Sequence, residues 1–305
     1  MKKRMIGIVG PTASGKTALS LLVGQRLQGD ILCMDSMQIY KGMDIGTAKP
    51  TKEEQTLVPH HLHSFLEPTE SFSVSQYAEM AQGEIERVDV PILVGGTGMY
   101  LQSLSLPMDY GAVGGDETIR KNYHEIADTQ GVDALHRILE SVDPISAARL
   151  HPNDVRRVVR ALEVYDLTGT PLSAQKMPEP EDSPYDFRLY ALDLQRDVLY
   201  QRVDRRVDQM MADGLLEEVK RLKDSSVPAD AQSMQGLGYK ELLPVLDGAM
   251  PLTDAVSLIK LRTRHYAKRQ LTWFKRDERI QWIPFTPRQS LEPISEMICE
   301  NYRKE

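Results

Sequence analysis

The sequence predicts an α/β fold in which a parallel sheet is flanked by helices and carries a helical insertion domain. Three observations support this prediction. A complete phosphate-loop motif, Gly10–Thr17, lies between an apolar run and a helical pattern. Apolar runs alternate with helical patterns along the first part of the chain, and each run ends in polar or glycine-rich residues. From residue 116 to residue 186 the pattern is helical or proline-rich. We therefore expect a P-loop NTPase-like core from residues 1–115 and 187–305, interrupted by a helical domain at 116–186.

The phosphate-loop motif matches the pattern G-x-x-x-x-G-K-S/T at every position. Met5–Val9 is the apolar run expected to form the preceding strand, and Ala18–Val23 begins the following helix. In this context backbone N–H groups converge on phosphate oxygens, and Lys16 places a full charge on the terminal phosphate. The Thr17 hydroxyl can ligate Mg²⁺. The predicted diphosphate- or nucleotide-binding residues are Gly10, Pro11, Thr12, Ala13, Ser14, Gly15, Lys16 and Thr17.

Two further apolar runs place functional candidates at the same edge of the predicted sheet. Asp30–Met34 reads as a strand that ends at Asp35, and Val90–Val94 reads as a strand that ends in the loop Gly95–Gly98. The helical pattern Val74–Arg87 lies between these strands. Because parallel α/β sheets bind ligands beyond the carboxyl ends of their strands, we expect the phosphate loop, Asp35 and the glycine-rich loop on one rim.

The remaining elements are mainly helical. Within the insertion domain the best-defined helix is Asp154–Thr168, with Asn153 or Asp154 as its N-cap and Gly169 beyond its end. A strand-like run at 189–194 then adds to the sheet. Three helical patterns follow, at 198–212, 238–246 and 253–275.

Composition and charge are typical of a globular enzyme and limit the possible partners. Hydrophobic residues make up 41% and charged residues 27% of the 305 residues, and no apolar run approaches the length of a membrane span. The two cysteines, Cys33 and Cys299, are far apart in the sequence, which favours reduced thiols and a cytoplasmic protein. The net charge of −7 argues against a protein that coats nucleic acid over its whole surface.

Positive charge is nevertheless concentrated in two helical stretches. Seven Lys or Arg residues and no Asp or Glu lie between Lys260 and Arg276, and Arg156, Arg157 and Arg160 form a second basic cluster. Such clusters on an acidic protein indicate a local track for a polyanion, although a solvated helix face explains them equally well.

Four candidate residues near the predicted phosphate site have more than one possible role. Asp35 follows a buried strand and could be a Mg²⁺ ligand, a general base or a turn cap. Arg202, Arg205 and Arg206 share one helix, where each could reach a phosphate or pair with an acid in solvent.

Two further groups of residues favour a structural interpretation. His60, His61 and His63 do not favour a zinc site, because neighbours in an extended segment point to opposite faces and no cysteine lies nearby. For Trp273 and Phe274, at the end of the basic helix, we favour a core role over stacking on bases.

Taken in order, the motifs resemble those of the bacterial tRNA dimethylallyltransferases, also called tRNA isopentenyltransferases, of the IPP transferase family. The resemblance covers nearly the whole chain, and the segments 35–40 and 44–50 in combination are far more specific than the phosphate loop. The matching segments are Gly10–Thr17, Asp35–Tyr40, Asp44–Pro50, His60–Leu62, Phe72 and Ser73 with Tyr77, Gly95–Tyr100, Asn153 and Asp154 with Arg160–Glu163, Gly238–Glu241, and Tyr266–Gln270 with Thr272–Phe274.

This resemblance implies a prenyl transfer. Dimethylallyl diphosphate would donate its five-carbon group to the N6 amine of the adenosine 3′-adjacent to the anticodon, at position 37 of tRNA, and diphosphate would leave. The phosphate loop would then hold the leaving diphosphate rather than an ATP awaiting cleavage. The catalytic residues that the resemblance implies are Asp35, Lys16, Thr97 and Arg206. Asp35 would accept the amine proton, Thr97 would contact the nucleotide, and Arg206 would steady the diphosphate.

The resemblance also implies a cofactor and partners. Mg²⁺ would bind in part through Thr17, and the partners would be dimethylallyl diphosphate and the tRNA anticodon stem-loop, with no membrane. We expect a monomer in the cytoplasm. The predicted tRNA-binding residues are Asp35, Ser36, Met37, Gln38, Thr97, Arg120, Arg156, Arg157, Val159, Arg160, Ala161, Leu162, Glu163, Lys268 and Arg269.

Two other functions fit parts of the sequence. A P-loop kinase of a small metabolite would use the same cradle and would suit the acidic net charge, but it leaves the basic stretch at 260–276 unexplained. A non-catalytic, ATP-gated RNA-binding module would bind tRNA in an ATP-dependent way and would not respond to prenyl diphosphates.

Overall fold

The computed structural model describes residues 2–106, 115–175 and 183–304 and divides the chain into two units. The larger unit contains Met1–Ser105 and Ser183–Glu305, and the smaller, helical unit is Leu106–Asp182. The strand that follows the helical unit, β5 (Tyr185–Asp193), begins before residue 186, where we expected the boundary. It does so because its first residues pair with the start of β1 (Lys3–Val9).

Among the described residues, six parallel strands form one sheet in the order β3-β2-β4-β1-β5-β6. This arrangement confirms the predicted fold class. β2 spans Asp30–Met34 as predicted, and β4 (Pro91–Gly95) is shifted by one residue from its predicted position. The sequence does not signal the two edge strands, β3 (His60–His61) and β6 (Ile280–Pro284). The first is too short for a periodic pattern, and the second ends in proline.

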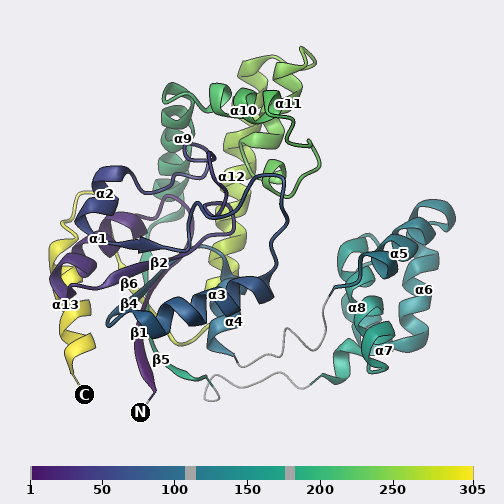
Figure 1. The fold of residues 1–305 in the computed structure, drawn as a ribbon, viewed down its shortest axis with the longest axis horizontal. Helices are drawn as coiled ribbons and strands as arrows, with labels where there is room; N and C mark the ends of the chain where they lie inside the picture. Colours follow the sequence, from purple (N-terminus) through teal and green to yellow (C-terminus); the bar gives the residue numbers. More distant parts are fainter. Residues whose placement is uncertain (1, 107–114, 176–182, 305) are drawn as a thin grey trace. The chain divides into compact units, whose positions relative to one another are not determined.

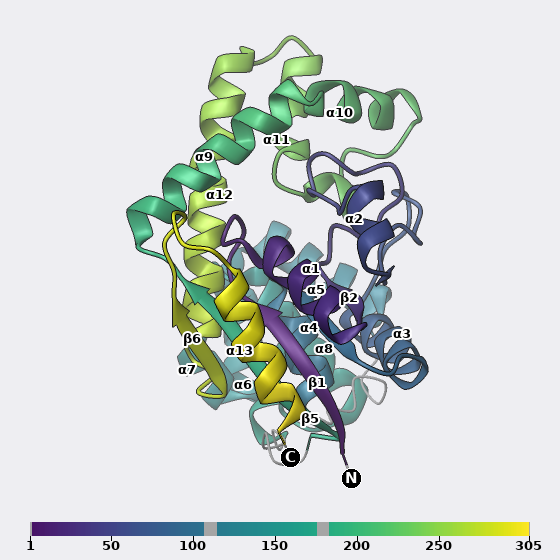
Figure 2. The same ribbon diagram turned by 90° about the vertical axis from the view of Figure 1, so that its left-hand side faces the viewer.

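Helices cover both faces of the sheet. On one face lie α1 (Lys16–Leu27) and α13 (Glu292–Arg303), which pack against each other (Figure 2). On the other face lie α3 (Val74–Arg87) and α4 (Gly98–Ser105). Apolar side chains along β1 alternate between the two faces, as the pleat of a strand requires, so the sheet is buried on both sides.

Beyond the carboxyl ends of the strands, four helices extend the larger unit (Figure 1). They are α9 (Arg196–Ala212), α10 (Leu215–Asp224), α11 (Tyr239–Leu246) and α12 (Leu252–Phe274). α9 and α12 are joined by ion pairs from Arg264 to Asp204 (3.1 Å) and from Lys260 to Asp208 (2.6 Å). The shorter pieces of this unit are α2 (Lys52–Leu57) and a 3₁₀ turn at Ser233–Gln235, and the helical unit contains a 3₁₀ turn at Leu172–Ala174. Within the described ranges no helix combines the length and the apolar character that crossing a membrane requires.

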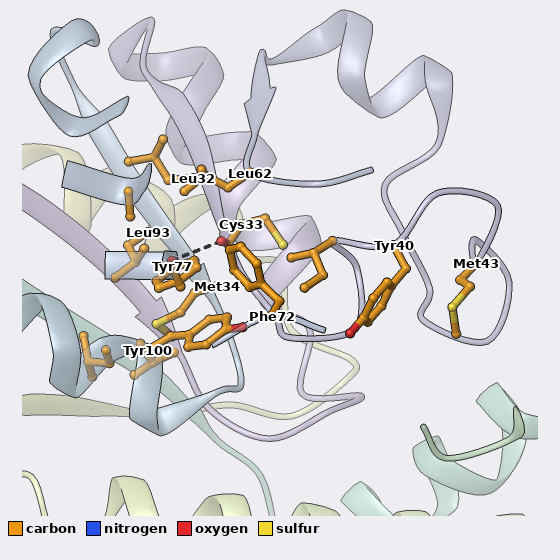
Figure 3. Close-up of a cluster of buried hydrophobic side chains, with 14 of the residues drawn as sticks. Leu32, Cys33, Met34, Tyr40, Met43, Leu62, Phe72, Tyr77, Leu93 and Tyr100 are labelled. Carbon is orange, nitrogen blue, oxygen red and sulfur yellow. Dashed lines mark hydrogen bonds between the residues drawn. The ribbon is translucent and has the colours of Figure 1, made fainter. Parts of the chain in front are cut away.

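A buried aromatic cluster supports the end of β2 (Figure 3). Tyr77 of α3 and Tyr100 of α4 stack with ring centroids 3.7 Å apart and ring planes 8° apart. The Tyr77 hydroxyl also donates a hydrogen bond to the carbonyl oxygen of Cys33 (3.1 Å). Burial raises the pKa of Tyr77, so this phenol remains a donor. The cluster thereby fixes the backbone that leads into Asp35.

The helical unit has its own core. Its helices are α5 (Glu117–Gln130), α6 (Val132–Val142), α7 (Pro144–Arg149) and α8 (Val155–Thr168). α8 begins after Asp154, one residue later than predicted, and ends before Gly169, whose φ of 67° allows the left-handed turn that stops the helix. The core residues include Leu135, Leu139, Val158 and Leu162.

Candidate active site

The phosphate loop joins β1 to α1 at the carboxyl edge of the sheet. Gly10, Ala13 and Gly15 have φ angles of 129°, 61° and 108°, so the loop turns repeatedly through conformations with positive φ. Gly15 is the N-cap of α1 and supplies no side-chain cap, which leaves the N–H groups of the first turn to an anion. Lys16 Nζ donates a hydrogen bond to the carbonyl oxygen of Pro11 (2.5 Å), so the lysine folds back over the loop.

Asp35 and Thr97 lie close together at neighbouring strand ends. The last residues of β2 and β4 are opposite each other in the parallel ladder, so the residues that follow them share one edge. Thr97 Oγ1 accepts a hydrogen bond from the N–H of Ser36 (3.2 Å). Asp35 Oδ1 accepts one from the N–H of Met37 (2.9 Å), an Asx turn that orients the carboxylate. The prediction that these residues and the phosphate loop share one rim is therefore confirmed.

Lys16 has a strongly lowered pKa. Its pKa falls from 10.5 to about 7, mainly because burial desolvates the ammonium group and also because the Arg206 guanidinium is nearby, while the Asp35 carboxylate opposes the shift. Three charged groups from three separate segments therefore lie within electrostatic reach of one another. Two cations and one carboxylate suit a site that binds a polyanion and accepts a proton beside it.

The structure separates the three arginines of α9 by their environments. Arg202 Nε donates to the carbonyl oxygen of Ala13 (2.7 Å) and so supports the backbone of the phosphate loop. Arg206 lies one turn later, where burial lowers its pKa and the charge of Asp35 raises it. Arg205 is exposed. Arg206 is thus the arginine of α9 within electrostatic reach of Lys16 and Asp35, while Arg202 is bonded to the phosphate loop.

The loop of residues 44–50 borders this site. Gln38 Nε2 donates to the carbonyl oxygens of Thr47 and Ala48 (both 3.1 Å), and the Cys33 thiol donates to Gln38 Oε1 (3.2 Å). We expected Gln38 to contact tRNA, and in the structure its amide holds the loop to the end of β2. Between the loop and α9 lies a pocket of about 500 Å³ whose lining includes Arg206.

Glu218 of α10 anchors the same loop, a role that we did not expect from the sequence. The side chain is buried, and its carboxylate accepts backbone N–H groups from Asp44 (2.9 Å), Ile45 (2.9 Å) and Gly46 (3.0 Å). It also accepts the hydroxyl of Tyr239 (2.6 Å). A single glutamate on an amphipathic helix gives no sequence signal for this role, because its backbone partners are more than 170 residues away.

α12 borders the site on another side. Phe274 is buried, as predicted, but the predicted core position of Trp273 is wrong. Trp273 is 40% exposed, and its indole lies beside Gly98, where a Cβ atom would lie 2.1 Å from the indole nitrogen. Lys268 and Arg269 are exposed on the same helix. α12 therefore carries exposed cations and an exposed aromatic ring near the end of β4.

In the helical unit, the residues predicted to bind tRNA differ in exposure. Arg156 and Arg157 of α8 are exposed. The buried carboxylate of Glu163 accepts hydrogen bonds from Arg120 Nε (2.8 Å) and Arg160 Nη1 (2.6 Å), so it orients two arginines. The apolar face of α8 packs into the unit's core, and three of the residues that we expect to bind tRNA have buried side chains there. These residues are Val159, Ala161 and Leu162.

The fold and the site define a P-loop α/β protein with a carboxylate and a hydroxyl group beside its phosphate cradle. A family model described as IPP transferase matches residues 38–277, and one described as isopentenyl transferase matches residues 3–59. The chain belongs to the IPP transferase family.

Relatives and solved structures agree with this assignment. The tRNA dimethylallyltransferase of Halalkalibacterium halodurans is 45% identical over 291 residues, which cover 94% of this chain and 92% of the relative. That of Geobacter metallireducens is 46% identical over 289 residues, or 93% of each chain. The structure of a Bacillus halodurans tRNA isopentenylpyrophosphate transferase is 41% identical, with a TM-score of 0.73 over 99% of this chain and 97% of that one.

A more distant structure shares the fold over most of the chain. A eukaryotic dimethylallyltransferase acting on tRNA is 31% identical, with a TM-score of 0.79 over 93% of this chain and 74% of that one. The family and these similarities identify the chain as a prenyltransferase and support this activity over the small-metabolite kinase that the phosphate loop alone would allow.

Proposed function

We propose that this protein transfers the dimethylallyl group of dimethylallyl diphosphate to the N6 amine of the adenosine 3′-adjacent to the anticodon, position 37 of tRNA, and releases diphosphate. One observation carries this proposal. At a single edge of the sheet, the Asp35 carboxylate lies within electrostatic reach of Lys16 and Arg206. A base for the acceptor's proton is thus placed beside a cationic cradle for the leaving group.

The cradle stabilises the leaving group. When the allylic C–O bond breaks, negative charge develops on the diphosphate, and catalysis requires donors and cations that are already in position at that place. The amides of the phosphate loop, Lys16 and Arg206 supply them. Because Lys16 is desolvated, its interaction with the diphosphate is stronger than it would be in water.

Asp35 acts on the acceptor side. The lone pair of the adenine amine is delocalised into the ring, so the amine is a weak nucleophile while it keeps both protons. We assign Asp35 as the base: the new N–C bond forms, the C–O bond to diphosphate breaks, and the amine proton passes to the Asp35 carboxylate. General-base assistance of this kind contributes about 10²- to 10⁴-fold. We assign the contact with the nucleotide to Thr97, whose hydroxyl accepts the N–H of Ser36 beside Asp35.

Mg²⁺ is the cofactor that we propose for the diphosphate. Thr17 is exposed in the first turn of α1, where its hydroxyl would hold the ion. Mg²⁺ at phosphates keeps several waters and takes few protein ligands, so one hydroxyl beside the cradle fits the ion. When bound, the ion would neutralise charge on the diphosphate oxygens.

The anticodon stem-loop of tRNA is the proposed partner. The target base must leave its stack to reach the site, and sequence-specific RNA recognition usually takes place in single-stranded loops. Arg156 and Arg157 of the helical unit, and Lys268 and Arg269 of α12, would contact phosphates, since all four are exposed. We infer that tRNA binding is the role of the helical unit, and that the protein is a cytoplasmic monomer.

Mass spectrometry of unmodified tRNA incubated with the protein and dimethylallyl diphosphate, without ATP, tests the reaction. We expect one dimethylallyl group on the anticodon loop, and Asp35→Asn should lower the rate at least about 10²-fold. Asp89→Asn is the matched control, because Asp89 is exposed and precedes β4 at the opposite end of the strand. An unmodified tRNA, or transfer of a γ-phosphoryl group from ATP to some acceptor, would overturn the proposal.

A further inference from the structure

Gln270 of α12 joins the two loops that form the site. Its side chain is buried, and both ends of its amide are used. Gln270 Oε1 accepts a hydrogen bond from the N–H of Thr12 in the phosphate loop (2.9 Å), and its Nε2 donates to the carbonyl oxygen of Gly96 (2.9 Å). Gly96 directly precedes Thr97. One amide group therefore connects the loop for the diphosphate to the loop beside the acceptor base.

A side chain at position 96 would displace the Gln270 amide from this contact. A Cβ atom there would lie 2.2 Å from Gln270 Nε2 and 3.2 Å from the carbonyl oxygen of Gly10. β1 and β4 are neighbours, with Val9 opposite Gly95, so the sheet sets the separation of the two loops where they begin. Beyond the strand ends the sheet no longer holds them together, and the Gln270 amide takes over this role.

The face of α12 that carries Gln270 lies along the site. Tyr266, Gln270 and Trp273 lie at positions i, i+4 and i+7, on one side of the helix. Burial raises the pKa of Tyr266, and the nearby charge of Asp35 raises it further, so this end of the face lies toward the carboxylate. Trp273 lies beside Gly98 at the other end. Gln270 is thus in the middle of the helix face that borders both loops.

We propose that Gln270 is a positioning residue that holds the dimethylallyl donor and the acceptor amine at reacting distance. The inference rests on the proposed prenyl transfer. Attack needs the amine nitrogen and the allylic carbon about 3–3.5 Å apart and aligned, and a misplacement of about 1 Å costs roughly 10²-fold in rate. Loss of the amide would leave each loop its own ligand contacts, while removing the support that relates one loop to the other.

Two variants test this role. Gln270→Met keeps the length of the side chain and removes both hydrogen bonds. Gln270→Glu keeps the acceptor for Thr12 and loses the donor to Gly96. The matched control is Gln232→Met, because Gln232 also uses both ends of its amide, on the N–H (2.9 Å) and the carbonyl oxygen (3.0 Å) of Phe72. That pair lies outside the loops of the site.

The measurements separate positioning from folding and binding. Full-length protein is incubated with tRNA and dimethylallyl diphosphate, and kcat and the dissociation constants of both substrates are determined. The fraction of consumed donor that is recovered on tRNA is also measured. The remainder is dimethylallyl alcohol, formed when water attacks the allylic carbon, the C–O bond to diphosphate breaks and water loses a proton. A donor that reacts without a correctly placed acceptor increases this remainder.

We expect both Gln270 variants to lower kcat by at least about tenfold, with both dissociation constants within about threefold of the unaltered protein and a smaller fraction of donor on tRNA. Gln232→Met should change none of these quantities. A kcat within about threefold of the unaltered protein, an equal loss of donor affinity, or an unchanged fraction on tRNA overturns the inference. If Gln270→Met does not fold, the same measurements on Gln270→Glu decide whether the positioning role holds. Absence of transfer by the unaltered protein overturns the proposed function, and the inference with it.

Discussion

Replacing Lys16 by arginine should remove a proton uptake that accompanies diphosphate binding. In the free protein the pKa of Lys16 is about 7, because burial and the neighbouring Arg206 disfavour the charged form. A diphosphate in the cradle brings negative charges to the ammonium group and raises this pKa again. Above pH 7 the complex therefore holds more protons than the free protein, so diphosphate affinity falls as the pH rises.

The size of the effect follows from the pKa. With a pKa of about 7, about one-tenth of free Lys16 is protonated at pH 8 and about nine-tenths at pH 6. If the bound lysine is fully charged, binding takes up about 0.9 proton at pH 8 and about 0.1 at pH 6. Above pH 7 the dissociation constant should rise by up to about tenfold per pH unit from this group alone.

Isothermal titration calorimetry measures this uptake directly. Inorganic diphosphate is titrated into the protein at pH 6 and pH 8, each in two buffers that differ in ionisation enthalpy. Lys16→Arg is the control, because a guanidinium stays protonated over this range. The difference between the two proteins cancels the protons that diphosphate itself takes up. Equal uptake by both proteins at pH 8 would refute the assignment of a depressed pKa to Lys16.

Three further predictions concern charged residues. Arg206→Met should lower kcat about 10²-fold by removing a cation at the leaving group. Arg205→Met, on the exposed side of α9, should change kcat by less than about twofold. Similar losses of kcat in the two variants would contradict the assignment of Arg206. Glu218→Ala leaves four donors without their acceptor and should lower the free energy of unfolding, measured in urea, by about 3 kcal/mol. The control Glu217→Ala, at an exposed position, should lower it by less than about 0.5 kcal/mol. Glu163→Gln should weaken tRNA binding about tenfold in a filter-binding assay, because Arg120 and Arg160 lose their carboxylate partner. Diphosphate binding should be unchanged. An equal loss of tRNA binding and diphosphate binding would indicate unfolding and contradict this role.

The parts of the site that depend on local sequence could be predicted. A phosphate loop works through backbone N–H groups and a helix N-terminus, and eight consecutive residues determine both. Gly10–Thr17 could therefore be assigned as a phosphate loop from the local sequence alone. The position of Asp35 and Thr97 on the same rim follows from the alternation of strands and helices, because parallel strands end at one edge.

The parts that depend on contacts between distant segments could not be predicted. The helical pattern alone does not separate Arg202, Arg205 and Arg206, because all three share a helix and its packing decides which one lies near Asp35 and Lys16; only the family resemblance pointed to Arg206. The backbone partners of Glu218 and Gln270 are likewise far away in the chain. A polar side chain that binds backbone leaves no pattern in its own neighbourhood, because any residue except proline offers an N–H and every residue a carbonyl.

The order of strands in the sheet has a consequence for synthesis on the ribosome. β1 pairs with β4 on one edge and with β5 on the other. β4 is synthesised early, but β5 is synthesised only after the whole helical unit. A nascent chain that has not yet reached Tyr185 thus carries an apolar strand with an open edge, the kind of surface that pairs with other chains. We expect cotranslational chaperones to engage this protein until the ribosome has passed Asp193, while the inserted helices fold ahead of the domain that surrounds them.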